Sequence, residues 1–186
     1  MRNKVSLFLI AAFFLAMRFP LEAFASNDAS GSSATLAIAT VSVQQVVDYR
    51  GIALKNYLKL KNSPLANDAG YIIRQADKYH LDWRLIPSIA GLESSYCLAI
   101  PFDSYNCYGY GIYGNKVRYF NSWKDGIATV SAALKYNYIA RGAVTVPEIG
   151  RIYAASPTWA VRVEANMRDL QDYSTKFETD SLPISL

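Results

Sequence analysis

The sequence is poor in the residues on which metal and nucleophile chemistry depends. Its 186 residues include one histidine and two cysteines. A single histidine excludes zinc sites built on paired histidines, and two cysteines exclude a site of four thiolates. Neither a GxGxxG fingerprint after a strand pattern nor a GxxxxGK[ST] loop occurs, so nothing indicates a nucleotide ligand. We therefore expect a protein that uses no metal and no cofactor.

Long apolar runs are confined to the N-terminus, where they have the form of a secretory signal. A basic start with Arg2 and Lys4 precedes the 13-residue run 5–17, and Ala23-Phe24-Ala25 follows as a cleavage motif. This pattern predicts a signal peptide over residues 1–25 and export to the periplasm, cell surface or extracellular space. Thirteen helical residues cover only about 20 Å, too short for a bilayer, so we expect no stable membrane span after cleavage, although a retained anchor stays open.

Excess charge is scarce as well. Residues 1–25 hold three of the 19 basic residues and one of the 15 acidic residues. The remaining chain is therefore nearly neutral, without the basic patch that a nucleic-acid-binding protein needs. We expect neither nucleic acid nor nucleotide as a partner, and we expect a monomer.

Beyond the signal, the pattern predicts one mainly α domain with flexible ends. Residues 26–41 are rich in Ser, Ala and Thr and lack aromatic residues, which favours a flexible arm. Residues 42–62 predict a helical lead-in, 63–173 the main domain and 174–186 a flexible tail. Helix-start signals occur at five places in the main domain, and the corresponding predictions are Ser63-Pro64 before a helix to about Ala76, Asp82 before 83–96, Ser122 and Asp125 before 127–139, Thr145 and Glu148 before 149–153, and Ser156-Pro157 before the last helix.

Glu93 is the candidate for acid–base chemistry. It is the only carboxylate between Asp82 and Asp103, in the otherwise neutral run LIPSIAGLESSYC. Near the end of its helix, both partial burial and the helix dipole would disfavour the charged form. We therefore expect a raised pKa, as a general acid requires. The plain alternative is a solvated helix glutamate.

An aromatic loop follows this helix. Residues 97–120 are rich in Gly and Tyr, and a short hairpin is expected at Gly114-Asn115. Five of the fourteen tyrosines fall within fifteen residues of this loop: Tyr105, Tyr108, Tyr110, Tyr113 and Tyr119. Such rings suit the faces of sugars, and glycines let the backbone approach a ligand. The rings could equally pack the edge of a small core.

The two cysteines predict a disulfide across this loop. In an exported protein, Cys97 and Cys107 are expected to pair. The bridge would hold the loop against the end of the Glu93 helix and bring Asn106 and Tyr108 near that carboxylate. The competing idea, a nucleophilic cysteine activated by His80, has less support because a disulfide already explains both cysteines.

Three stretches resemble a known superfamily. AGLESSY at 90–96, SYNCYGYGI at 104–112 and FNSWKDGI at 120–127 are similar to the lysozyme-like superfamily. The nearest branches are the bacterial cell-wall endo-β-N-acetylglucosaminidases and the soluble lytic transglycosylases. The segments 63–65 and 82–85 also resemble the lead-in helices of this group, and the likeness covers about residues 60–172.

The resemblance implies a two-lobed helical fold that cleaves the β-1,4 bond between amino sugars of peptidoglycan glycan strands. Glu93 would be the general acid and Ser94 its support. Asn106, Tyr108 and Gly109, with the adjacent Tyr110, would line the sugar groove beside the aromatic loop or hairpin. The resemblance further implies that Tyr153 is the aromatic residue facing the catalytic glutamate.

A convincing second carboxylate is lacking. Of the candidates Asp103, Asp125 and Glu148, the last two occupy capping-box positions. This favours mechanisms with one carboxylate, either a lytic transglycosylase or a substrate-assisted hydrolase, and the sequence does not separate them. Two alternatives stay open: a non-catalytic peptidoglycan- or chitin-type glycan-binding module, and a wall-remodelling domain linked to an export assembly.

Overall fold

The computed structural model describes residues 48–181, and 65% of them are helical. Within this part of the chain there are six α-helices and no strand, which confirms a mainly α domain. The predicted signal peptide and flexible arm lie outside the described residues. Among the helices that are described, none is long and apolar enough to cross a membrane.

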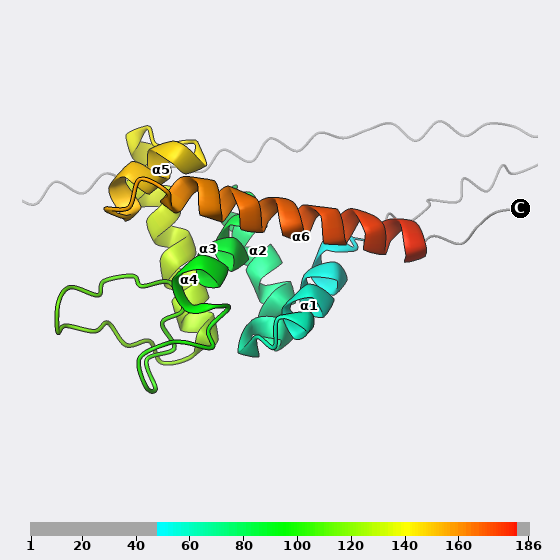
Figure 1. Cartoon of the computed structure of the whole chain (residues 1–186), viewed down its shortest axis with the longest axis horizontal. Coiled ribbons are helices and arrows are strands. Elements are labelled where there is room, and N and C mark those ends of the chain that lie inside the picture. The colour runs from blue at the N-terminus through cyan, green and yellow to red at the C-terminus, as the bar shows by residue number, and fades with distance from the viewer. Residues whose placement is uncertain (1–47, 182–186) are drawn as a thin grey trace, which may run out of the picture. The chain divides into compact units, whose positions relative to one another are not determined.

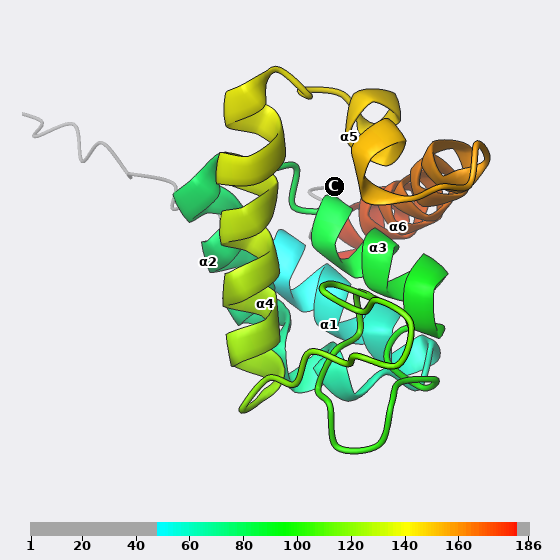
Figure 2. The same ribbon diagram turned by 90° about the vertical axis from the view of Figure 1, so that its left-hand side faces the viewer.

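Four of these six helices pack around the other two, α3 and α6 (Figure 1). The bounds of the six are α1 Arg50–Leu60, α2 Ala69–Tyr79, α3 Leu85–Ser94, α4 Trp123–Ala133, α5 Val146–Tyr153 and α6 Trp159–Ser181. Helix α6 is the longest and packs along α1, α3 and α5. Figure 2 shows α3 in the middle of the bundle, with α5 above it and the long α3–α4 connection below its end.

Helix α3 lies at the centre because nearly all residues in its first two turns are apolar. Residues 85–90 are all buried, with Ile86 and Ile89 fully so. The neutral run that includes Glu93 is therefore a core helix. Its C-terminal end leaves the core, which is where Glu93 lies.

Three predicted helix starts are confirmed by their caps. The Ser63 hydroxyl accepts from the Leu65 N–H at 3.2 Å and begins a 3-10 turn, Pro64–Asp68, that leads into α2. The Ser122 hydroxyl accepts from the Asp125 N–H at the start of α4. Thr145 and Glu148 form a complete capping box on α5.

The bounds of two predicted helices were wrong. Helix α3 starts at Leu85, after a turn that closes from the Leu85 N–H to the Asp82 carbonyl at 3.0 Å, while the Asp82 carboxylate accepts from the Arg84 N–H at 2.9 Å. It stops at Ser94, not Tyr96, because residues 95–97 all take positive φ, which ends a right-handed helix. The last helix begins at Trp159, since the residues after Ser156-Pro157 first form a turn that closes from the Trp159 N–H to the Ser156 carbonyl.

Two helices run further than the sequence indicates. The helix that begins at Trp123 continues through a π-helical segment, Leu134–Tyr138, and a 3-10 turn, Ile139–Arg141. Helix α6 continues to Ser181, so the expected tail is helical from 174 to 181, and 182–186 lie outside the described residues. The extension of α6 is explained by packing, because Ser174 is buried and the ring of Tyr173 contacts Tyr57 at a centroid distance of 5.5 Å.

The expected hairpin is reduced to one bridge. Tyr113 and Lys116 exchange both backbone hydrogen bonds at 3.0 Å across Gly114-Asn115, and pairing goes no further. Gly114 takes a φ of +55°, which a tight turn requires. Because Tyr113 and Tyr119 are mostly exposed, the flanking segments have no buried face to hold a longer ladder.

Candidate functional site

Glu93 lies at the end of α3 with one carboxylate oxygen held in place. Its Oε1 accepts a hydrogen bond of 2.7 Å from the Nε1–H of Trp159, the first residue of α6. The indole is 4% exposed and therefore has little freedom to move. The expected partial burial of Glu93 was wrong: the residue is exposed, because it lies on the last turn of α3, where the helix leaves the core.

Trp159 is a residue of the candidate site that the sequence did not single out. It lies on an apolar stripe of the last helix with Val163 and Met167, and such a stripe predicts only a core role. A buried indole still needs an acceptor for its N–H, and here that acceptor is the carboxylate of Glu93. The contact joins residues 66 positions apart, so no local pattern indicates it.

The predicted disulfide is confirmed, and Ser94 reinforces it. Cys97 and Cys107 are bonded with their Cα atoms 4.7 Å apart, which leaves no free cysteine for a pair with His80 in the described chain. The buried Ser94 hydroxyl lies 2.8 Å from the Cys107 carbonyl and accepts from the Cys97 N–H at 3.0 Å. Ser94 therefore connects the helix to the loop, and its buried hydroxyl is not presented to a ligand.

Asn106 organises the loop from inside. Its Nδ2 group donates to the carbonyls of Tyr110 at 2.9 Å and Arg118 at 3.0 Å. Its Oδ1 atom accepts from the N–H groups of Tyr108 and Tyr110, each at 3.3 Å. The residue is 1% exposed, so it shapes the cleft without presenting a group to a ligand.

Gly109 brings backbone next to the Glu93 carboxylate. Its φ is +61°, and a Cβ there would lie 3.2 Å from Glu93 Oε2. A side chain would therefore crowd the carboxylate as well as strain the backbone. The disulfide and Asn106 explain how the loop reaches this position, since Asn106 and Cys107 come shortly before Gly109 in the chain.

The two predicted tyrosines beside Glu93 have different roles. Tyr108 is fully buried and belongs to the core, so its assignment to the sugar groove was wrong. Tyr153 is partly buried; its hydroxyl donates to the Tyr108 carbonyl at 2.7 Å, and its ring stacks on Trp159 at 4.9 Å. Burial, and then the charge of Glu93, raise the pKa of Tyr153 well above its usual value. Its hydroxyl is therefore a donor at neutral pH.

A small pocket opens beside these residues. It has a volume of about 100 Å³ and is lined by Gly109, Tyr110, Gly111, Ile112, Tyr113, Tyr138 and Tyr153. Tyr110 is half-buried and lines this pocket. A wider pocket of about 430 Å³ shares Tyr110, Gly111, Tyr113 and Tyr138 with it. We call the two together the tyrosine cleft.

The other candidate carboxylates do not add an acid–base pair. Asp125 accepts from the Asn121 N–H at 3.0 Å, and Glu148 accepts from the Thr145 N–H at 2.8 Å, so both act as helix caps. The Thr145 N–H lowers the pKa of Glu148. Asp103 is exposed in the loop with a φ of +52°. Within residues 48–181, no cluster of His, Cys, Asp or Glu could hold a metal ion.

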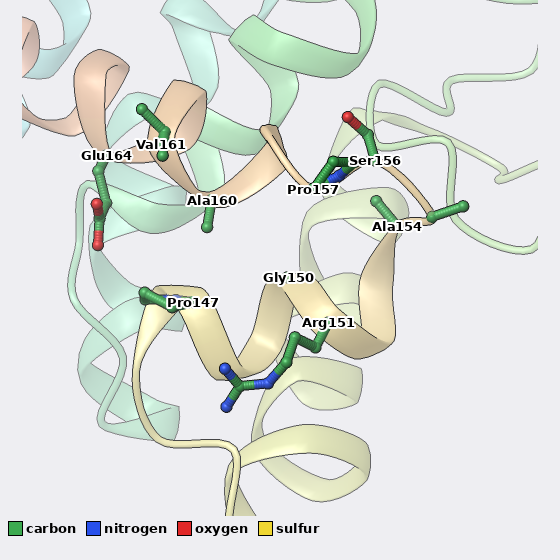
Figure 3. A pocket seen from close by; sticks show the side chains of 10 residues that line it. Pro147, Gly150, Arg151, Ala154, Ser156, Pro157, Ala160, Val161 and Glu164 are labelled. Carbon is green, nitrogen blue, oxygen red and sulfur yellow. The ribbon is translucent and has the colours of Figure 1, made fainter.

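A separate pocket lies between α5 and the start of α6 (Figure 3). It has a volume of about 460 Å³, with Arg151 as its one basic and Glu164 as its one acidic lining residue. It is larger than the small pocket beside Gly109. It shares no lining residue with the tyrosine cleft. Glu93 lines none of these pockets, but Gly109, which lies next to its carboxylate, lines the tyrosine cleft and not this pocket, so we assign the chemistry to the tyrosine cleft.

Comparison of the sequence with protein-family models and with curated proteins gives no match. The arrangement of Glu93, Trp159, Tyr153 and Gly109 must therefore be interpreted from its own geometry.

Proposed function

We propose that the protein cleaves the β-1,4 bond between amino sugars in peptidoglycan glycan strands, with Glu93 as the general acid. The observation that carries the proposal is an exposed carboxylate fixed by a buried indole next to a cleft walled by tyrosine rings. Tyrosine faces suit sugars, and an oriented carboxyl group at the edge of such a cleft suits proton transfer. The same proposal assigns the helical domain to a two-lobed lysozyme-like fold. The disulfide fits an exported protein.

The hydrogen bond from Trp159 favours one position for the proton on Glu93. The indole N–H donates to Oε1, and the carbonyl oxygen of a protonated carboxyl group is a better acceptor than its hydroxyl oxygen. This contact therefore favours the proton on Oε2, the oxygen next to Gly109. This orientation turns the acidic O–H toward the loop that borders the tyrosine cleft.

The proposed reaction uses one carboxyl group twice. Glu93 gives its proton to the glycosidic oxygen, and the bond from C1 of the sugar to that oxygen breaks. In a lytic transglycosylase, the 6-hydroxyl of the same sugar then attacks C1 and returns its proton to Glu93, which leaves a 1,6-anhydro end. In a substrate-assisted hydrolase, the N-acetyl oxygen attacks C1 first, and water opens that ring and gives its proton to Glu93. Neither route needs Asp125 or Glu148, which are occupied as caps.

The test is a digest of purified peptidoglycan with mass spectrometry of the new chain ends. We expect the wild type to form new ends, with anhydro ends indicating the transglycosylase and reducing ends the hydrolase. Glu93→Gln should lower the rate by about 10²-fold or more, as loss of a general acid does. Glu164→Gln is the matched control, because this carboxylate lines the separate pocket between α5 and α6, and we expect it to retain activity.

Two outcomes would overturn the proposal. One is full activity of Glu93→Gln. The other is saturable binding of glycan strands by the wild type without any new ends, which would identify a non-catalytic glycan-binding module.

A further inference from the structure

We infer that the wide part of the tyrosine cleft selects glycan strands that carry carboxylate groups, through Arg118 and Arg141. The inference rests on the proposed function and deepens it. It assigns the two arginines a role in substrate selection in addition to the chemistry of Glu93.

The wide pocket continues the path from the proposed acid. The small pocket includes Gly109, which contacts Glu93, and Tyr153. The wide pocket of about 430 Å³ begins at the shared Tyr110 and Tyr138 and extends to Arg118 and Arg141. A strand bound with one bond at Glu93 would thus place neighbouring sugars there.

The charge in this wide pocket has one sign. Arg118 and Arg141 are its only charged lining residues, and no acidic residue lines it. Neither arginine takes part in an ion pair or a side-chain hydrogen bond with another described residue. Both are exposed. The two guanidinium groups therefore keep all their donors available to a ligand.

Arg118 is also held in position. Its guanidinium lies over the ring of Tyr110 at 5.4 Å and over that of Phe120 at 5.6 Å. Contacts of this kind orient the group without using its N–H donors. A preoriented guanidinium binds a carboxylate through two parallel hydrogen bonds.

Other lining residues of the wide pocket come from the irregular end of the α4 helix. Asn137 and Tyr138 line the pocket from the π-helical segment, and Arg141 ends the 3-10 turn that follows. Short π-helical segments occur frequently at functional sites. Here the segment brings an amide, a phenol and a guanidinium to one pocket, which is the set of groups that a sugar bearing a carboxylate would require.

The chemistry of the ligand follows from these groups. Glycan strands stripped of peptide carry a free lactyl carboxylate on every second sugar. In peptide-bearing strands that carboxyl group forms the amide bond to the peptide, and the carboxylates lie on the peptide instead, whereas chitin strands carry none. Both sources present the same anion to the arginines. We therefore expect the pocket to favour peptidoglycan strands over neutral chito-oligosaccharides.

The test compares three probes: chito-oligosaccharide, glycan strands stripped of peptide, and peptide-bearing strands. The variants are Arg118→Gln, Arg141→Gln and their combination. Arg162→Gln on α6 removes the same charge outside both parts of the cleft and serves as the control. For the double variant we expect kcat/KM on stripped strands to fall about tenfold or more, because two charged contacts are lost. The rate on chito-oligosaccharide should stay within about twofold, and Arg162→Gln should match the wild type.

A loss confined to peptide-bearing strands would still support the inference and identify the peptide carboxylates as the bound group. An unchanged ratio between charged and neutral probes in both single variants and the double variant would overturn it. Arg141→Gln keeps the test valid if loss of Arg118 disturbs the loop, because Arg141 lies on a different element.

Binding measured by calorimetry on Glu93→Gln separates this inference from the proposed function. If the wild type cleaves nothing but Glu93→Gln prefers carboxylated strands through the two arginines, the catalytic proposal fails and the inference stands. If cleavage occurs without charge preference, the inference alone fails.

Discussion

A single hydrogen bond between distant residues orients the proposed acid. Trp159 Nε1 donates to Glu93 Oε1 at 2.7 Å, and the Trp159 ring stacks on Tyr153. A hydrogen bond to an ionised carboxylate is stronger than one between two neutral groups. Because the indole N–H only donates, it also favours the carbonyl form of Oε1 and hence a proton on Oε2.

We expect Trp159→Phe to lower kcat/KM by about tenfold or more. Hydrogen bonds to charged groups contribute about 1.5–3 kcal/mol, and without the donor the carboxyl group is free to rotate away from the cleft. Phe keeps an aromatic ring against Tyr153, so the fold should persist. The measurement is the initial rate of glycan-strand cleavage, together with a thermal unfolding curve.

Trp123→Phe is the matched control for this substitution. Trp123 is half-buried and its ring packs edge-on against Tyr105 at 4.9 Å, with no hydrogen bond to Glu93. An equal loss of activity in both variants would show that the loss of ring volume, and not of the hydrogen bond, explains the effect.

At the scale of elements, the junction of α3 with the aromatic loop defines the site. The Cys97–Cys107 bond and the Ser94 hydroxyl both join the two segments. The disulfide and the Ser94 hydroxyl together hold the backbone of Gly109 next to Glu93. The outer rings of the loop, such as Tyr113, are exposed, so its position depends on this covalent link together with its buried residues, such as Tyr108.

We expect the double variant Cys97→Ser, Cys107→Ser to lose about 3 kcal/mol of unfolding free energy, the chain-entropy value for a loop of about ten residues. Urea denaturation measures this loss. Cleavage should fall even at temperatures where the variant stays folded, because Gly109 would no longer be held beside the carboxylate. Wild type treated with a thiol reductant should behave like the variant. An unchanged denaturation midpoint in both samples would contradict this role for the disulfide.

Local rules predicted the starts of elements better than their ends. The caps at Ser122 and Thr145 follow from residues within one helical turn, so sequence spacing is sufficient to find them. The end of α3 follows from positive φ at Ser95, Tyr96 and Cys97, none of which is glycine. The disulfide and the Ser94 contacts accompany this conformation. Both involve Cys107, at the other end of the loop, so the residues at the end of the helix do not indicate them.

The sequence predicted only part of the candidate site, because some of its contacts join residues that are far apart in the chain. Glu93 and the disulfide were found because scarcity singled them out. Trp159 was missed because its partner lies 66 residues away. Tyr108 was misassigned because composition cannot tell which ring of a tyrosine-rich loop turns into the core and which, like Tyr110, faces the cleft.

At the scale of the whole molecule, three buried or partly buried tyrosines connect different parts of the domain. Tyr57 on α1 donates to Asp169 on α6 at 2.7 Å, Tyr108 lies in the core, and Tyr153 on α5 donates to the loop. Burial is the largest cause that raises the pKa of each phenol above its usual value near 10. Ionisation of these groups is therefore linked to unfolding.

We expect these three phenols to cause no pH dependence of the unfolding free energy below pH 10. Above pH 10 they should make the unfolding free energy fall as the pH rises. Between the unfolded and folded pKa values the native state binds more protons, so alkali favours unfolding, by up to about 1.4 kcal/mol per pH unit for each tyrosine. Urea denaturation at pH 8 and at several values above 10 measures this slope.

The variant Tyr108→Phe should reduce the slope by the contribution of one tyrosine. Its stability at pH 8 should equal or exceed that of the wild type, because the Tyr108 hydroxyl has no hydrogen-bond partner among the described residues. Identical slopes for the two proteins would show that Tyr108 ionises freely in the folded state and is not the core residue described above.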